Sequence, residues 1–117
     1  MRDFYAVISE YKTRLKVVDG EPVRIFVAEI NSGNDLRVAV GTTGKRGGDS
    51  GHGGRTFLKM TDLAATIGSV TVNQNSAEPF HDLEIVLEGD SELETFLTAL
   101  KFAVNRLESY LIENQRE

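Results

Sequence analysis

The residues that could do chemistry are concentrated in one glycine-rich segment, residues 41–56, which reads "GTTGKRGGDSGHGGRT" and holds seven of the chain's eleven glycines. Ordering a glycine costs more conformational entropy than ordering any other residue, so an ordered loop of this kind indicates that its backbone amides must approach something closely. Amides framed by glycine, beside basic side chains, are typical of a nest for a phosphate or carboxylate. We therefore predict that the loop at residues 41–54, with the residue that follows it, recognises an anion or nucleotide through Lys45, Arg46, Gly47, Gly48, Asp49, Ser50, His52, Gly53 and Arg55.

Two other interpretations of the same segment stay open. The loop is either a flexible connection between two strands or a mobile segment that orders on a protein partner. A plain flexible linker consists mainly of Gly and Ser, whereas this segment also carries three basic residues, an aspartate and a histidine. This mixture favours a role in recognition.

Catalysis by the segment is a weaker hypothesis. The letters Gly48-Asp49-Ser50-Gly51 resemble the nucleophile segment of chymotrypsin-like serine proteases, but those enzymes need a histidine upstream of the serine and none precedes Ser50. "GTTGKR" has neither the spacing of a Walker A loop nor the hydroxyl after the lysine. A small hydrolase that uses His52 with Asp49 or a bound metal is the least favoured alternative, and we predict no catalytic residues.

A metal or cofactor site is not predicted either. Imidazole and carboxylate ligands could come from Asp49, His52 and the pair His81–Asp82. Two predicted strands separate the two histidines, so nothing in the sequence requires them to converge.

Composition limits the possible partners. A chain of 117 residues makes one domain, and its formal charge of −5 argues against generic nucleic-acid binding, which uses a basic face. No apolar run approaches the ~20 residues of a membrane span, and the N-terminal "MRDFYAVISEYK" has acidic and polar residues where a signal peptide needs an uninterrupted apolar block. From these two features we expect a cytoplasmic protein. The chain has no cysteine, which excludes disulfides.

Most of the chain up to residue 88 reads as strands. Residues 5–17 alternate with period two, although Phe4, Val7, Ile8, Tyr11, Leu15 and Val18 also form a helical stripe with Asp3 as a possible N-cap. A hairpin is predicted from residues 23–30 and 36–40 around "NSGND", and further strands at 55–60, 69–73 and 81–88. Residues 61–66 could form one helical turn capped by Thr61 or Asp62.

The C-terminus predicts an amphipathic helix over residues 91–113, capped by Asp90 or Ser91, with an apolar stripe that belongs to the core. Phe102 lies off this stripe and is either an edge-of-core residue or part of a subunit contact. The predicted fold is α+β: a β-rich region at 4–88 forms an antiparallel, meander-like sheet of five or six strands. The helix covers one face, and the other face is solvated or lies in a dimer.

"GGDSGHGGRTFLKMTDLA" and "EGDSELETFLTALKFAV" together look similar to small proteins of bacterial mobile elements and phages. The resemblance implies an accessory protein and assigns no functional residue. Taken together, the sequence predicts a small non-catalytic homo-oligomer that binds a small anionic ligand. A protein–protein interaction or inhibitory role is the alternative.

Overall fold

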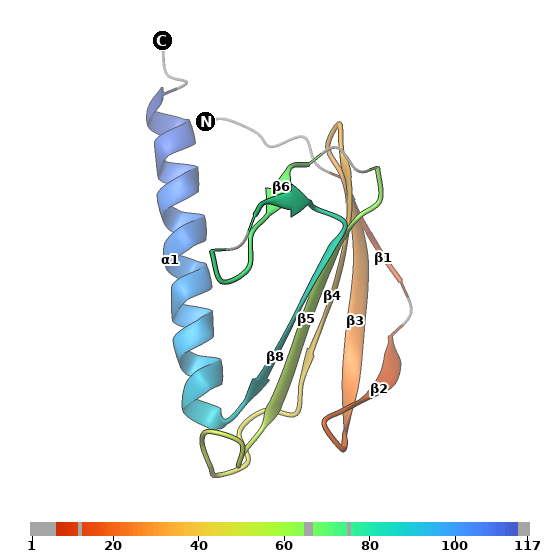
Figure 1. Ribbon diagram of the computed structural model, residues 1–117, viewed down its shortest axis with the longest axis vertical. Helices are drawn as coiled ribbons and strands as arrows, with labels where there is room; N and C mark the ends of the chain where they lie inside the picture. Colours follow the sequence, from red (N-terminus) through yellow and green to blue (C-terminus); the bar gives the residue numbers. More distant parts are fainter. Residues whose placement is uncertain (1–6, 12, 65–66, 75, 115–117) are drawn as a thin grey trace.

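The computed structural model describes residues 7–11, 13–64, 67–74 and 76–114 of the chain (Figure 1). In chain order the elements are β1 (Val7–Glu10), β2 (Arg14–Val18), β3 (Glu21–Asn31), β4 (Asp35–Thr42), β5 (Arg55–Asp62), β6 (Ser69–Val70), β7 (Glu78–Pro79), β8 (Asp82–Glu88) and α1 (Asp90–Asn114). No helix among these residues is long and apolar enough to cross a membrane.

The main sheet has six antiparallel strands in the order β1-β3-β4-β5-β8, and β2 also pairs with β3. The long strand β3 pairs with β2 along residues 21–25 and with β1 along residues 28–31. Both N-terminal strands therefore lie on the same edge of β3. The predicted α+β class is confirmed, as is the meander-like sheet with one long C-terminal helix against it. The hairpin of β3 and β4 forms where the alternation of apolar and polar residues predicts it.

The alternating N-terminal segment forms strands, but it is interrupted. Residues 7–10 and 14–18 are β1 and β2, and the chain leaves the ladder between them. The helical alternative is wrong for these residues, while residues 3–6 lie outside the described part of the chain. Local alternation of apolar and polar residues predicts one continuous strand, because it carries no information about how a segment divides between two stretches of the strand with which it pairs.

Two smaller predictions also change. The predicted strand at 69–73 is only two residues long, and it pairs with β7 in a separate hairpin instead of joining the main sheet. Among residues 61–64, none is helical: β5 extends to Asp62, whose carboxylate accepts hydrogen bonds from the amides of Ala64 and Ile67. Residues 65–66 lie outside the described residues.

The buried core lies on the concave face of the sheet, the face turned away from α1. The cross-strand register places its members on this one face: Val18, Val23, Ile25, Val27, Ala39 and Phe57. β2 curls over them, and the ammonium group of Lys16 lies 5.2 Å from the ring centroid of Phe57. The core is therefore closed by the sheet itself.

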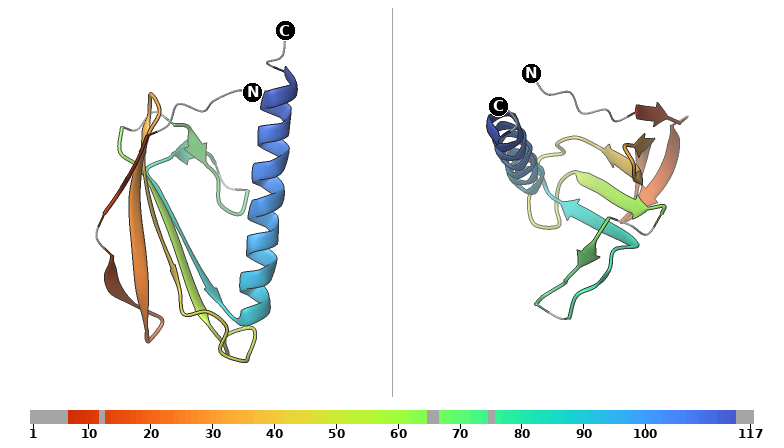
Figure 2. Two further views of the ribbon diagram at one scale, coloured as in Figure 1. Left: turned by 180° about the vertical axis from the view of Figure 1, so that it is seen from behind. Right: turned by 90° about the horizontal axis from the view of Figure 1, so that it is seen from above.

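Helix α1 runs along the opposite face. Figures 1 and 2 show that helix and sheet meet at the end where β8 leads into α1, beside the loop between β4 and β5, and diverge toward the helix C-terminus. No residue of α1 is buried. The prediction that its apolar stripe is core is therefore wrong, because the helix is held at one end only. Phe102, which is 67% exposed, is not an edge-of-core residue.

Candidate functional site

The glycine-rich loop does form a nest of converging amides, and an acidic side chain of the same chain occupies it. The carboxylate of Asp90, the first residue of α1, accepts hydrogen bonds from the amides of Arg46 (2.9 Å), Gly47 (2.6 Å), Gly48 (3.3 Å) and Gly54 (2.9 Å). These bonds, led by those from Arg46 and Gly54, lower the pKa of Asp90 to about 2. The loop therefore stabilises a negative charge of the chain itself, at the junction between β8 and α1.

The loop also caps the helix. The Asp49 carboxylate accepts a 2.7 Å hydrogen bond from the amide of Ser91, and this bond is the main reason that the pKa of Asp49 is lowered. The Ser50 hydroxyl donates to Glu92 at 3.1 Å. A free helix N-terminus leaves amides without partners. Here the Asp49 carboxylate accepts a hydrogen bond from a backbone amide in the first turn of α1. Asp90, one of the two predicted N-cap residues, accepts hydrogen bonds from the loop instead.

Basic side chains of the loop pair with acidic residues of the same molecule. Lys45 forms an ion pair with Glu94, and Arg46 lies 3.6 Å from Glu21. The Arg55 side chain is only 14% exposed: its Nε lies 3.3 Å from an Asp19 oxygen, and its guanidinium donates to the carbonyls of residues 51, 53 and 54. The predicted site residues thus lie in one loop, apart from Arg55, which begins β5 directly after it. The two arginines, the lysine and most of the loop amides already have partners within the chain.

No catalytic or metal-binding arrangement involves the histidines in the described structure. His52 is exposed in the loop, and His81 is exposed just before β8. Among the described residues, no group of three or more His, Asp or Glu side chains could hold a metal ion.

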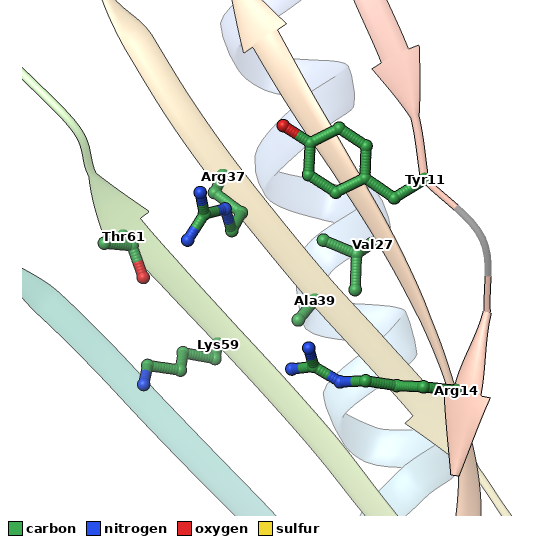
Figure 3. Close-up of a pocket in the computed structure, with 7 residues that line it drawn as sticks. All are labelled: Tyr11, Arg14, Val27, Arg37, Ala39, Lys59 and Thr61. Carbon is green, nitrogen blue, oxygen red and sulfur yellow. The ribbon is translucent and has the colours of Figure 1, made fainter. Parts of the chain in front are cut away.

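A second site lies on the concave face of the sheet, beyond the end of the core. It is a cavity of about 340 Å³ lined by Tyr11, Arg14, Val27, Arg37, Ala39, Lys59 and Thr61 (Figure 3). Val27 and Ala39 are buried and form an apolar floor. The other five lining residues surround this floor, and α1 lies behind the sheet in this view.

The strand register explains why these residues meet. Val27, Ala39 and Lys59 are direct neighbours across β3, β4 and β5, and Arg37 pairs with Thr61 in the next row of the same face. Arg14 begins β2 and reaches across from the curled edge strand (Figure 3). The backbone amide of Tyr11 donates to the carbonyl of Val27 at 2.8 Å, which holds the tyrosine at the rim.

The charge of this cavity opposes that of the whole molecule. Three of the thirteen basic residues of a chain with a net charge of −5 line one hollow, and no acidic residue lines it. Two acidic residues lie beside these cations: the Glu29 carboxylate is 3.2 Å from the Arg37 guanidinium, and Glu84 is the cross-strand neighbour of Lys59. Converging cations of this kind raise the local concentration of anions.

Tyr11, Glu29 and Arg37 form one polar network at the rim. Hydrogen bonds from Tyr11 and Arg37 lower the pKa of Glu29, and the bond to Glu29 raises the pKa of Tyr11. The Nε atom of Arg37 is buried and has no hydrogen-bond partner among the described residues, as is also the case for the Nε atom of Arg55 beside the glycine-rich loop. A buried donor without an acceptor is costly, and it marks a place where a ligand oxygen would be stabilised.

Sequence reasoning missed this cavity because its cations come from β2, β4 and β5 and share no motif. Arg37 and Lys59 each stand between two apolar residues, and Arg14 stands between Thr13 and Leu15, in alternating strands; this pattern is typical of a solvated face. The only signal was the alternation itself, which places Lys59 on the face of Phe57. To predict the cavity from this alternation, one would also need the register between the strands, which the pattern does not give.

Comparison with known proteins adds no identification: the chain matches no protein-family model, no curated protein and no solved structure. The functional argument therefore rests on the geometry described above.

Proposed function

We propose that this protein is a non-catalytic binding protein that takes a small organic anion in the concave cavity. The observation that carries the proposal is the convergence of Arg14, Arg37 and Lys59 on one hollow of a protein whose net charge is −5. Guanidinium groups bind carboxylates and phosphates through paired hydrogen bonds, and the buried Nε of Arg37 supplies a donor without a partner.

Size and lining narrow the ligand class. A cavity of about 340 Å³ is at the small end of the range for metabolite pockets, roughly 300–1,000 Å³. The apolar floor of Val27 and Ala39 suits a hydrocarbon or ring portion, while Tyr11 and Thr61 offer hydroxyl groups. The class that fits is a small molecule with one or two carboxylate or phosphate groups beside an apolar part.

The glycine-rich loop remains the predicted alternative location for the anion. There an incoming anion would have to displace the Asp90 carboxylate from four amides and compete with the ion pairs of Lys45 and Arg46. The concave cavity needs no such displacement, apart from weakening one contact between Arg37 and Glu29. The cost of displacement is the reason to favour the cavity.

The test is calorimetric titration with inorganic phosphate, adenosine monophosphate, succinate, citrate and benzoate. We expect at least one of these probes to bind, and we expect Arg14→Gln and Lys59→Gln each to weaken that binding about tenfold or more, because each removes a charge-assisted hydrogen bond. Preference for succinate and citrate over phosphate identifies a carboxylate site, and the reverse identifies a phosphate site.

Two further variants locate the site. Lys101→Gln makes the same charge change on an exposed position of α1 and should leave affinity unchanged, whereas Arg46→Gln reports on the loop. Loss of binding in Arg46→Gln with full binding in the two cavity variants would move the anion to the loop. Absence of heat with every probe, at concentrations up to the millimolar range, would contradict the proposal for both locations.

A second candidate function is protein interaction, including the homo-oligomer predicted from the sequence. One observation favours it: large apolar side chains of α1 and of the adjacent sheet face are exposed. The surface and its occupant are argued in the next subsection.

A further inference from the structure

The face of the sheet turned toward α1 is apolar across four strands. Two complete cross-strand rows, each running through β3, β4, β5 and β8, contain only apolar residues: Phe26, Val40, Leu58 and Ile85 in one row, and Ala28, Val38, Met60 and Leu83 in the next. None of these eight residues is buried, and Phe26 is 53% exposed. In a sheet with a solvated face, these positions would be polar.

The stripe of α1 that faces this surface is uncovered as well. The exposed large apolar residues of this stripe are Leu97, Leu100, Val104, Leu107, Tyr110 and Leu111, and the most exposed are about two-thirds accessible. Near the helix start, Phe96 and Ala99 line a groove with Leu87 of β8. Farther along the helix, sheet and helix diverge (Figures 1 and 2), and the large apolar side chains of the stripe are exposed there. We call these two facing apolar surfaces, the two sheet rows and the helix stripe, the wedge.

The area involved fits a protein interface. A large side chain presents roughly 150–250 Å² when fully exposed, so the six side chains of this stripe at about half exposure present roughly 600 Å² from the helix alone. A stable interface buries about 800 Å² on each partner. Exposed apolar patches of this size on soluble proteins mark interaction sites.

We propose that a second copy of this chain covers the wedge, with the helix of each copy packed against the apolar sheet face of the other. Each copy carries both halves of the contact, a sheet face that needs a helix and a helix that needs a sheet. A two-fold axis therefore satisfies both surfaces in both copies at once. The two sheet rows contain no charged residue, so the net charge of −5, which opposes self-association, is not concentrated in the contact.

The first test measures mass in solution by light scattering after size-exclusion chromatography, over a range of concentrations. We expect the natural chain to be a dimer and Leu107→Glu to be a monomer with an unchanged circular dichroism spectrum, because Leu107 is 66% exposed within one copy. Phe102→Glu is the matched control: Phe102 is 67% exposed on the same helix but lies off the apolar stripe, and its variant should remain a dimer.

The second test distinguishes the proposed contact from a contact between two helices. Since the chain has no cysteine, Val104→Cys and Val40→Cys can be purified separately, mixed and treated with a short bis-maleimide. We expect cross-links between the two variants, helix to sheet, to exceed those within either variant alone. A natural chain that stays monomeric at all concentrations would overturn the proposal, as would a dimer that survives Leu107→Glu or cross-links only from helix to helix.

Discussion

The Asp90 carboxylate accepts from amides of residues that lie 36 to 44 positions away in the sequence, and it connects the glycine-rich loop to the start of α1. The substitution Asp90→Asn removes the negative charge. It also places a side-chain NH₂ group, which is a hydrogen-bond donor, among backbone amides that are donors themselves. We expect the melting temperature at pH 7 to fall by several degrees, measured by differential scanning calorimetry. Asp82→Asn, at an exposed aspartate of β8, is the control and should leave the melting temperature nearly unchanged.

The same carboxylate predicts a pH dependence. Its folded-state pKa is lowered to about 2 from an ordinary value of 3.8, so its contribution to stability is complete above about pH 4 and is lost as the pH falls toward 2. The difference in melting temperature between the natural chain and Asp90→Asn should therefore shrink between pH 4 and pH 2. A difference that stays constant over this range would mean that the charge of Asp90 does not stabilise the fold.

At the scale of elements, the loop holds the helix only if its two ends, at Gly44 and Gly54, approach each other closely. A Cβ atom on Gly54, which is buried, would collide with the carbonyl oxygen of Gly44. We expect Gly54→Ala to lower the free energy of unfolding by about 1–3 kcal/mol, measured by urea denaturation. Gly68→Ala adds a methyl group where no atom lies within 4 Å and should have a much smaller effect. Equal effects of the two substitutions would show that the loop does not need this close approach.

The elements that local pattern determines were predictable, and those that depend on pairing were not. The hairpin of β3 and β4, strand β8 and helix α1 follow from periodicity. The observed β3, β4 and α1 extend the predicted bounds by one or two residues at each end, and β8 begins one residue later than predicted. The division of this segment into β1 and β2 was missed because it arises from how the two strands share β3. The position of the core was missed because an apolar stripe on a helix does not reveal whether its own sheet covers it.

At the scale of the whole molecule, the sequence located the loop residues but not the cavity. Glycines and charges adjacent in the chain stand out in a sequence, and the convergence of amides at residues 46–48 and 54 follows from them. The acceptor could not be foreseen, because nothing in the segment points to Asp90. The cavity needs three strands in register before Arg14, Arg37 and Lys59 come together.

Because the core and the apolar wedge lie on opposite faces of the sheet, they should respond differently when the proposed dimer is disrupted. Hydrogen exchange of the natural chain and of Leu107→Glu, followed by mass spectrometry, separates the two faces. We expect faster exchange in the variant over residues 97–111, where the helix loses its cover, and unchanged exchange over residues 23–27, which belong to the core of the concave face. Faster exchange over both regions would mean that the helix stabilises the whole fold within one copy, and unchanged exchange over 97–111 would mean that nothing covers the helix in solution.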